Sequence, residues 1–177
     1  MEETVDVMFL DGQVVAPVND LTRDIYDKNR YGELFNKSKF VYALVEALFL
    51  VERGKFNVKI GKTGRGVDFN QFVKKAIKIE PSFWTRYCVY KDLRKRGYVV
   101  KTALKFGADF RVYDRGVKPG EDHAKWVVFP VPESNTLTWH EFSAKNRVAH
   151  STKKRLLLGI VDAESAVTYY EVKWVRP

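Results

Sequence analysis

Leu-Leu-Leu-Gly-Ile-Val at residues 156–161 is an apolar run of strand length, and Val-Thr-Tyr-Tyr-Glu-Val-Lys-Trp at residues 167–174 is a second strand pattern. The polar residues 162–165, Asp-Ala-Glu-Ser, join the two. A helix is predicted over residues 138–151, just before the first of these strands. Three further short strand patterns lie upstream, at residues 98–102, 108–113 and 126–131. We therefore predict a C-terminal domain with a mixed central sheet flanked by helices.

A helix is predicted at the start of the C-terminal domain and a smaller unit before it. Pro81 and Gly97 frame this helix of about four turns, because proline favours helix starts and glycine favours helix ends. Further upstream the patterns predict a hairpin over 7–16 with Asp11-Gly12 at its turn, helices over 20–28, 41–51 and 69–79, and a strand over 56–60. The predicted fold class is α+β, with a small mixed α/β N-terminal domain over 1–80 and a second domain over 81–177.

Charge and composition indicate a globular protein with a basic second half. Hydrophobic residues make up 45% of the 177 residues, which is enough for a core. Residues 82–177 hold 18 Lys and Arg against 10 Asp and Glu, a net +8, whereas residues 1–81 carry a net +1. Such an asymmetry suits a phosphate-backbone partner, although a solubilising surface would have the same composition.

Location is predicted from what the sequence lacks. The single cysteine, Cys88, allows no intrachain disulfide and is typical of a reducing interior. No apolar run reaches the roughly 18–20 residues of a membrane span, and the first residues do not resemble a secretion signal. We expect a cytoplasmic protein without a membrane partner.

The common catalytic motifs are missing from the sequence. It contains no zinc-type Cys/His cluster, no His-Glu-x-x-His and no Gly-x-x-x-x-Gly-Lys-Ser/Thr phosphate loop. Its aspartates are scattered rather than paired for two-metal catalysis. Three loop-proximal residues remain: Tyr113 at a predicted strand end, His123 before the next strand, and a lysine in the His150-Ser151-Thr152-Lys153-Lys154 segment. Taken alone, these three residue types are also compatible with an ordinary protein surface.

Several segments together resemble the archaeal tRNA-splicing (tRNA-intron) endonuclease family. The resemblance covers nearly the whole chain in order, from Arg30-Tyr31-Gly32 and Leu44-Val45-Glu46-Ala47-Leu48 in the first domain to the second domain. The second-domain segments are 98–113 (YVVKTALKFGADFRVY), 147–156 (RVAHSTKKRL) and 169–175 (YYEVKWV).

The resemblance implies an endoribonuclease of the tRNA-intron lyase type that needs no metal or cofactor, with a nuclease-like C-terminal catalytic domain over 81–177. It places the catalytic residues at Tyr113 as general base, His123 as general acid and Lys154 as electrostatic stabiliser, with Lys153 as the ambiguous neighbour. Lys154 is preferred because it aligns best with the apolar strand that follows. His150 falls outside this triad, and we expect it to pack or cap.

The resemblance also implies a substrate and an assembly. The substrate would be precursor tRNA carrying a bulge–helix–bulge, cut to leave a 2′,3′-cyclic phosphate and a 5′-hydroxyl. Arg147 and Trp174 match the positions that hold a bulged base. Family members of this length form tetramers, either of identical chains or with a related non-catalytic subunit. The acidic loop 162–166 lacks the Gly-Asp step of many relatives, which slightly favours the second arrangement.

Two other functional classes remain compatible with the residues. A non-catalytic RNA-binding or assembly subunit would have no need of an intact Tyr113, His123 and Lys154. A metal-dependent DNA nuclease of similar fold would require a divalent cation. Cleavage of a bulge–helix–bulge RNA in EDTA distinguishes these possibilities.

Overall fold

The structure is a computed structural model that describes residues 4–61 and 64–177. The chain forms two compact units, Met1–Trp84 and Thr85–Pro177. The division falls within helix α4 (Phe83–Lys95), a few residues after the boundary predicted at 80/81. Within the described residues, no helix combines the length and apolar character needed to cross a membrane.

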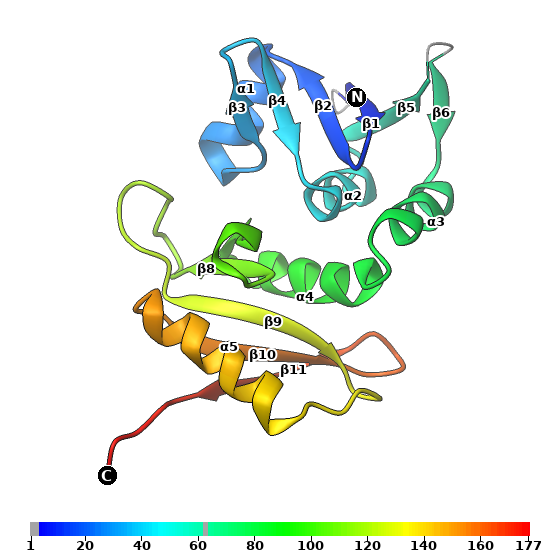
Figure 1. Cartoon of the computed structure of the whole chain (residues 1–177). Coiled ribbons are helices and arrows are strands. Elements are labelled where there is room, and N and C mark those ends of the chain that lie inside the picture. The colour runs from blue at the N-terminus through cyan, green and yellow to red at the C-terminus, as the bar shows by residue number, and fades with distance from the viewer. Residues whose placement is uncertain (1–3, 62–63) are drawn as a thin grey trace. The chain divides into compact units, whose positions relative to one another are not determined.

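The first unit is built on a six-stranded sheet with the order β3-β4-β2-β1-β5-β6 (Figure 1). Its hairpin is confirmed: Asp11 and Gly12 both have positive φ, as the preferred two-residue turn between antiparallel strands requires. The fifth strand runs parallel to the first, and the other pairs are antiparallel. The strands are β1 (Val5–Leu10), β2 (Gln13–Pro17), β3 (Glu33–Phe35), β4 (Lys39–Tyr42), β5 (Phe56–Ile60) and β6 (Arg65–Val67).

The helices of this unit begin at capping residues or at buried apolar residues. Asn19 caps α1 (Asp20–Asn29) and Asp68 caps α3 (Phe69–Ile79), each by accepting a backbone N–H of the first turn. The helix predicted from residue 41 is wrong at its start, because α2 (Leu44–Glu52) begins later. Residues 39–42 instead form β4, which pairs with β2 and buries Phe40 and Tyr42.

The second unit contains a five-stranded sheet with the order β11-β10-β9-β8-β7. Strands β9 and β10 are parallel, and the remaining pairs are antiparallel, so the predicted mixed sheet is confirmed. The strands are β7 (Val99–Thr102), β8 (Phe110–Tyr113), β9 (Trp126–Pro132), β10 (Arg155–Val161) and β11 (Val167–Val172). The last strand ends at Val172, so Trp174 lies beyond it rather than within it.

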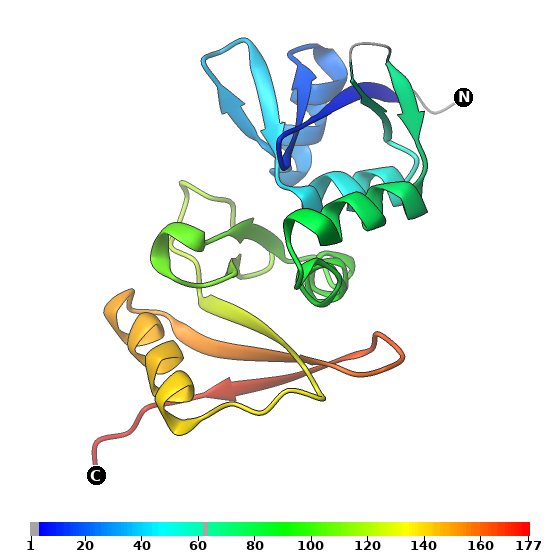
Figure 2. The same ribbon diagram turned by 45° about the vertical axis from the view of Figure 1, so that its right-hand side comes forward.

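The two helices α4 and α5 (Trp139–Ser151) pack against opposite faces of this sheet (Figures 1 and 2). On one face, Ala149 of α5 joins a buried cluster with Val127, Phe129 and Leu156. On the other, Val89 of α4 lies against Gly159, where an added Cβ would come within 2.9 Å of the valine Cγ2. Because side chains alternate along a strand, every strand residue can be assigned to the α5 face or the α4 face.

Candidate active site

Backbone hydrogen bonds bring the three predicted catalytic segments to one end of the second sheet. Lys125 donates its N–H to Val112 O at 2.9 Å and accepts at its own O from the N–H of Arg155 at 3.0 Å. Tyr113 directly follows Val112, His123 lies two residues before Lys125, and Lys154 directly precedes Arg155. Strand order explains this convergence. The end of β8 adjoins the start of antiparallel β9, and the start of parallel β10 adjoins the same point.

Tyr113 is the last residue of β8 and is buried, with 5% of its surface exposed. It pairs with Val99 of β7, and alternation places it on the same face as Arg111, two residues earlier. Arg111 pairs with Val127, which belongs to the cluster beneath α5. Tyr113 therefore belongs to the α5 face. Because the side chain is buried, the phenol has little rotational freedom.

His123 lies in the exposed segment between β8 and β9, where two tight turns shape the backbone. In the second turn, Lys118-Pro119-Gly120-Glu121, Glu121 N–H donates to Lys118 O at 3.0 Å and Gly120 has φ +95°. Proline and then a positive-φ glycine at the two central positions are the signature of a type II turn. His123 itself is anchored through its backbone N–H, which donates to the Asp122 carboxylate. Its imidazole faces solvent.

Lys154 is the last residue of a complete Schellman motif at the end of α5. Its N–H donates to Ala149 O at 2.8 Å, and the N–H of Lys153 donates to His150 O at 3.1 Å. The motif needs a left-handed residue, and Lys153 fills that position with φ +54°. The Lys154 ammonium turns back toward the helix end and donates to Thr152 O at 3.0 Å. Lys154 thus lies on the α5 side, whereas the exposed Lys153 serves the turn.

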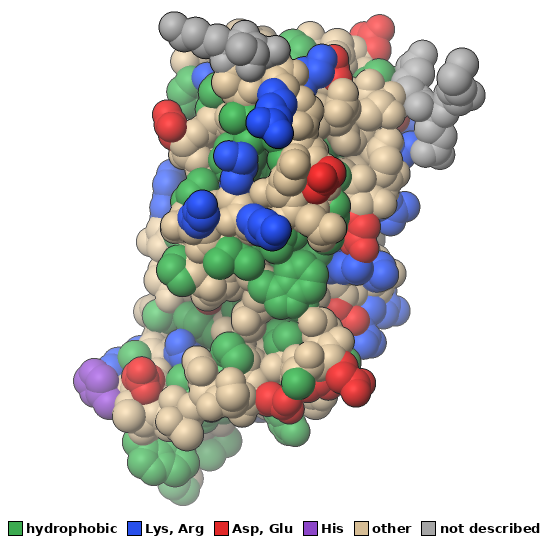
Figure 3. Space-filling model, turned by 90° about the vertical axis from the view of Figure 1, so that its right-hand side faces the viewer, with side chains coloured by type: hydrophobic (Ala, Val, Ile, Leu, Met, Phe, Trp, Pro, Cys, Tyr) green, Lys and Arg blue, Asp and Glu red, His purple; other side chains and the backbone are tan. Residues whose placement is uncertain are grey.

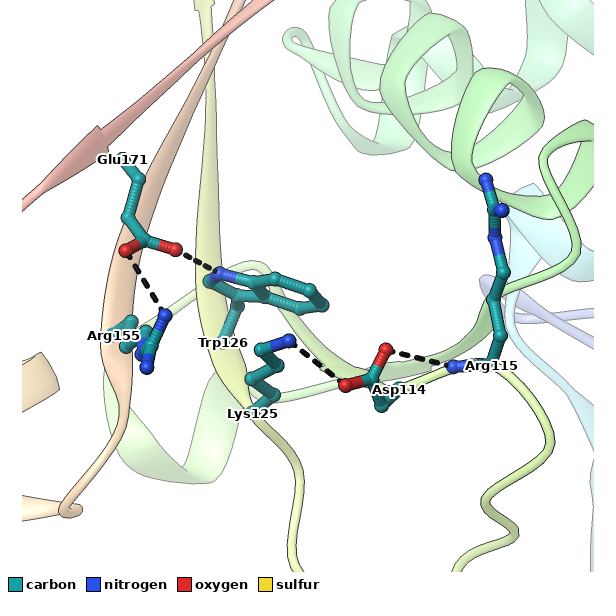
Figure 4. Close-up of polar contacts among 6 residues, drawn as sticks. All are labelled: Asp114, Arg115, Lys125, Trp126, Arg155 and Glu171. Carbon is teal, nitrogen blue, oxygen red and sulfur yellow. Dashed lines mark hydrogen bonds and ion pairs between the residues drawn. The ribbon is translucent and has the colours of Figure 1, made fainter.

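A second polar network lies on the α4 side of the same sheet end (Figure 4). Glu171 of β11 accepts from Trp126 Nε1 at 2.8 Å and from Arg155 at 3.2 Å. The Trp126 hydrogen bond and the Arg155 charge hold the pKa of Glu171 below its usual value. One carboxylate therefore links β11 to the first residues of β9 and β10, each of which adjoins a predicted catalytic segment.

The rest of this network lies just after β8. The Asp114 carboxylate accepts from Lys125 Nζ at 2.8 Å and from the Arg115 backbone N–H at 3.0 Å, and both interactions lower the pKa of Asp114 (Figure 4). The Arg115 guanidinium lies over the Tyr98 ring, 4.9 Å from the centroid. Sequence reasoning missed Glu171 and Trp126. The only signal available was the alternation along residues 167–174, which assigns Glu171 to the same face of the sheet as Tyr169.

Arg147 and Trp174, the predicted RNA-binding pair, both line a pocket of about 500 Å³ between α5 and the C-terminal segment. Trp174 is 62% exposed, and its ring meets the edge of the His150 ring at 5.1 Å between centroids. Arg176 lies over the same indole. His150 packs, as expected; it contacts Trp174 and also lines the pocket. The contact depends on two segments remote in sequence.

Two further findings concern ligating residues and the cysteine. Across residues 4–61 and 64–177, no three His, Cys, Asp or Glu side chains gather closely enough to hold a metal ion. Cys88 is a free, buried thiol in α4, and burial raises its pKa.

The sequences of both units match the models of a known family. Residues 83–169 match the model of the tRNA intron endonuclease catalytic C-terminal domain, and residues 5–73 match that of the tRNA intron endonuclease N-terminal domain. The two models together cover most of the chain. The chain belongs to the tRNA intron endonuclease family.

Curated relatives agree over nearly the full length. The tRNA-splicing endonuclease of Thermococcus gammatolerans is 40% identical, over 96% of this chain and 98% of the relative. That of Methanothermobacter thermautotrophicus is 38% identical, over 94% and 95%. The Nanoarchaeum equitans enzyme is 44% identical over a shorter stretch, 76% of this chain and 88% of the relative. The family predicted from the sequence motifs is thus confirmed.

Proposed function

We propose that this chain cleaves precursor tRNA at bulge–helix–bulge exon–intron junctions, using Tyr113, His123 and Lys154. The observation that carries the proposal is the pair of backbone hydrogen bonds at Lys125, which tie together the ends of the three segments bearing these residues. Family membership supplies the reaction class. The meeting of the three backbone segments at one sheet end supports the choice of these residues.

The chemistry divides among the three side chains. The ribose 2′-oxygen attacks the adjacent phosphorus while the bond from phosphorus to the 5′-oxygen breaks, leaving a 2′,3′-cyclic phosphate and a 5′-hydroxyl. Tyr113 takes the 2′-proton, and His123 donates a proton to the departing 5′-oxygen. Lys154 stabilises the negative charge that builds on the phosphoryl oxygens. No step uses a metal ion.

Recognition would come from an unpaired base rather than from a paired helix. Single-stranded RNA bases bind by stacking on aromatic rings and guanidinium planes. Arg147 and Trp174 offer one of each in a single pocket. We assign this pocket to a bulged base, with a second subunit completing the clamp.

Assembly into a tetramer follows from the need to cut both ends of an intron. Strand β11 lies at the edge of its sheet, with Tyr170 58% exposed, and edge strands are available for pairing. In the acidic loop, the Asp162 carboxylate accepts the N–H groups of Glu164 and Ala166, so it already holds the turn. Glu164 is left as the exposed acid of the loop. This supports a heterotetramer with a related non-catalytic subunit over a tetramer of identical chains.

The test is cleavage of a bulge–helix–bulge RNA by the purified chain in excess EDTA, with the solution mass measured in parallel. We expect cyclic-phosphate products in EDTA and a kcat at least about 100-fold lower for Tyr113→Phe, because loss of a general base typically costs 10²–10⁴-fold. If the chain alone is inactive, a related subunit should restore cleavage and raise the mass to that of a tetramer.

Three outcomes would contradict the proposal. Strict magnesium dependence would indicate a metal nuclease. A Tyr113→Phe variant with an unchanged rate-versus-pH curve would remove the base assignment. An assembled complex that keeps full activity after His123→Ala and Lys154→Gln would make this chain the non-catalytic partner.

A further inference from the structure

Helix α3 of the first unit has an uncompensated basic face. Its buried side chains, Phe72 and Ala76, lie one turn apart and fix which side of the helix faces the core. The outward face carries three exposed lysines, Lys74, Lys75 and Lys78. Figure 3 shows a group of Lys and Arg side chains on the side of the molecule where Figure 1 draws α3 and β6. We call these three lysines the α3 basic face.

The α3 basic face lacks the acidic neighbours that other helices provide. In α1, Lys28 pairs with Asp24 four residues earlier, and after α4 Arg96 pairs with Asp92 in the same way. Residues 69–79 contain no Asp or Glu, although Asp68 caps the start of the helix and Glu80 follows its end. Among the described residues, no carboxylate forms an ion pair with the three lysines. Lys74 and Lys78 are themselves four residues apart, where like charges oppose helix formation. Only Lys78, in the last turn, is favoured by the helix dipole.

The net charge of residues 1–81 is close to zero, but the acidic residues of the first unit do not lie on α3 with the three lysines. Acidic residues of the unit gather elsewhere, for example Asp20, Asp24 and Asp27 on α1. Three ammonium groups within little more than one helical turn form a compact positive surface that suits a polyanion. A precursor tRNA is a polyanion far longer than the junction that is cut, so its body presents phosphates away from the scissile bond.

We infer that the α3 basic face binds the phosphate backbone of the substrate RNA outside the bulge–helix–bulge, which gives the first unit a role in substrate affinity. This inference rests on the proposed function for the identity of the RNA. Lysine contacts to phosphates carry no sequence information, so the face would position the RNA body rather than select the junction. Its contribution should weaken as salt rises, because binding releases condensed counterions.

The experiment compares the triple variant Lys74→Gln, Lys75→Gln, Lys78→Gln with a matched control, Arg23→Gln, Lys28→Gln, Lys37→Gln. The control removes the same number of exposed positive charges from α1 and the turn after β3, so it reports the effect of net charge together with loss of the Lys28–Asp24 ion pair. Each protein is assayed on full-length precursor tRNA and on a short bulge–helix–bulge RNA. Kd is measured against salt for both RNAs, together with kcat and the solution mass.

For the α3 variant we expect binding of the full-length RNA to weaken roughly tenfold to hundredfold at 0.1 M salt. The log–log salt slope should fall by about two to three, close to one per lysine. The short RNA should keep its kcat and its Kd within about twofold, and the control should behave as wild type on both RNAs.

Equal losses on the two RNAs, equal losses in the control variant, or an unchanged salt slope would overturn the inference. So would a lower solution mass with unchanged RNA affinity, which would make the α3 basic face a protein contact. If wild type cleaves neither RNA, the proposed function fails. The salt slopes for binding of the full-length RNA by the α3 and control variants would still decide the role of the lysines.

Discussion

At the scale of single residues, the two adjacent lysines after α5 have different tasks. Lys153 takes the left-handed position that ends the helix, and Lys154 turns its ammonium back toward the helix end. From the sequence, either lysine could be the catalytic one. Only the alignment with the apolar strand that follows favoured Lys154 over Lys153. The backbone conformation supports the choice of Lys154, because Lys153 is needed in the left-handed conformation that ends the helix.

Lys153→Gly should therefore stabilise the protein while leaving catalysis intact. Glycine adopts positive φ without the strain that a side chain causes, so the free energy of unfolding should rise by about 0.5–1 kcal/mol in a denaturant titration. Its kcat should stay within about twofold, whereas Lys154→Gln should lower kcat by about 100- to 1,000-fold. The reverse pattern would exchange the roles of the two lysines.

Glu171 gives a prediction with a defined pH direction. Its folded-state pKa is lowered, chiefly by Trp126 and then by Arg155, so its stabilising effect is present above the ordinary value of 4.5. The effect is lost as the pH falls through the lowered folded-state pKa. Glu171→Gln should cost at most about 1 kcal/mol at neutral pH, and this difference from wild type should vanish in acid.

Trp126→Phe separates the two causes. It removes the indole donor and keeps Arg155, so the pKa of Glu171 should move part of the way back up in an NMR titration of the carboxyl group. An unchanged titration would show that the Trp126 hydrogen bond has no influence on this carboxylate.

At the scale of elements, the helices and longer strands were predictable, because each has a local signal. Capping residues precede α1, α3 and α5, and glycines follow α2 and α4. The short strands β3, β4 and β6 were missed. They span only three or four residues, and Val41 also fits the helical spacing of the residues after it. Their pairing partners, not their own sequence, make them strands.

The site was predictable to a similar extent. Tyr113, His123 and Lys154 came from motifs that resemble a family, and the structure supports their grouping through strand order and the Lys125 hydrogen bonds. The contacts of Glu171 with Trp126 and of His150 with Trp174 could not be predicted. Each joins segments remote in the chain, whose proximity is a result of folding.

The contact between α4 and β10 gives a prediction for the elements. In Gly159→Ala, the new Cβ would lie 2.9 Å and 3.2 Å from the two Val89 methyl carbons, which are buried and cannot yield freely. We expect a loss of about 1–3 kcal/mol in the free energy of unfolding. Val89→Ala alone should cost a similar amount through its cavity.

The double variant should lose less than the sum of the two single variants, because each change relieves the other. Chemical denaturation of the four proteins measures this coupling. Strict additivity would show that α4 moves away from the strand without resistance.

At the scale of the whole molecule, the exposed residues after the last strand bear on the proposed assembly. Trp174 and Val175 are 62% and 74% exposed beyond the edge strand β11, which leaves them available to RNA or to another subunit. If Trp174 binds RNA, its substitution should leave the mass of the complex unchanged. If it binds another subunit, the mass should fall. The pocket shared by Arg147 and Trp174 favours the use by RNA.

Trp174→Leu should raise KM about tenfold or more, since the loss of one stacked base typically costs 1–3 kcal/mol, with kcat and the mass of the assembly unchanged. The matched control is Trp139→Leu, which replaces an 83% exposed tryptophan at the start of α5 and should leave KM within about twofold. A smaller mass for Trp174→Leu would instead place Trp174 in a subunit interface.

The tight connection from α5 into β10 limits which changes of chain length the protein can tolerate. No spare residue lies between the Schellman motif and the first strand residue, and side chains along a strand alternate with a period of two. A single insertion after Thr152 would disrupt the helix end that holds Lys154 and send the buried leucines of β10 to the wrong face of the sheet. The turns between β8 and β9 carry no such periodic constraint. We therefore expect natural length variation to accumulate beside the histidine and to be excluded beside the lysine.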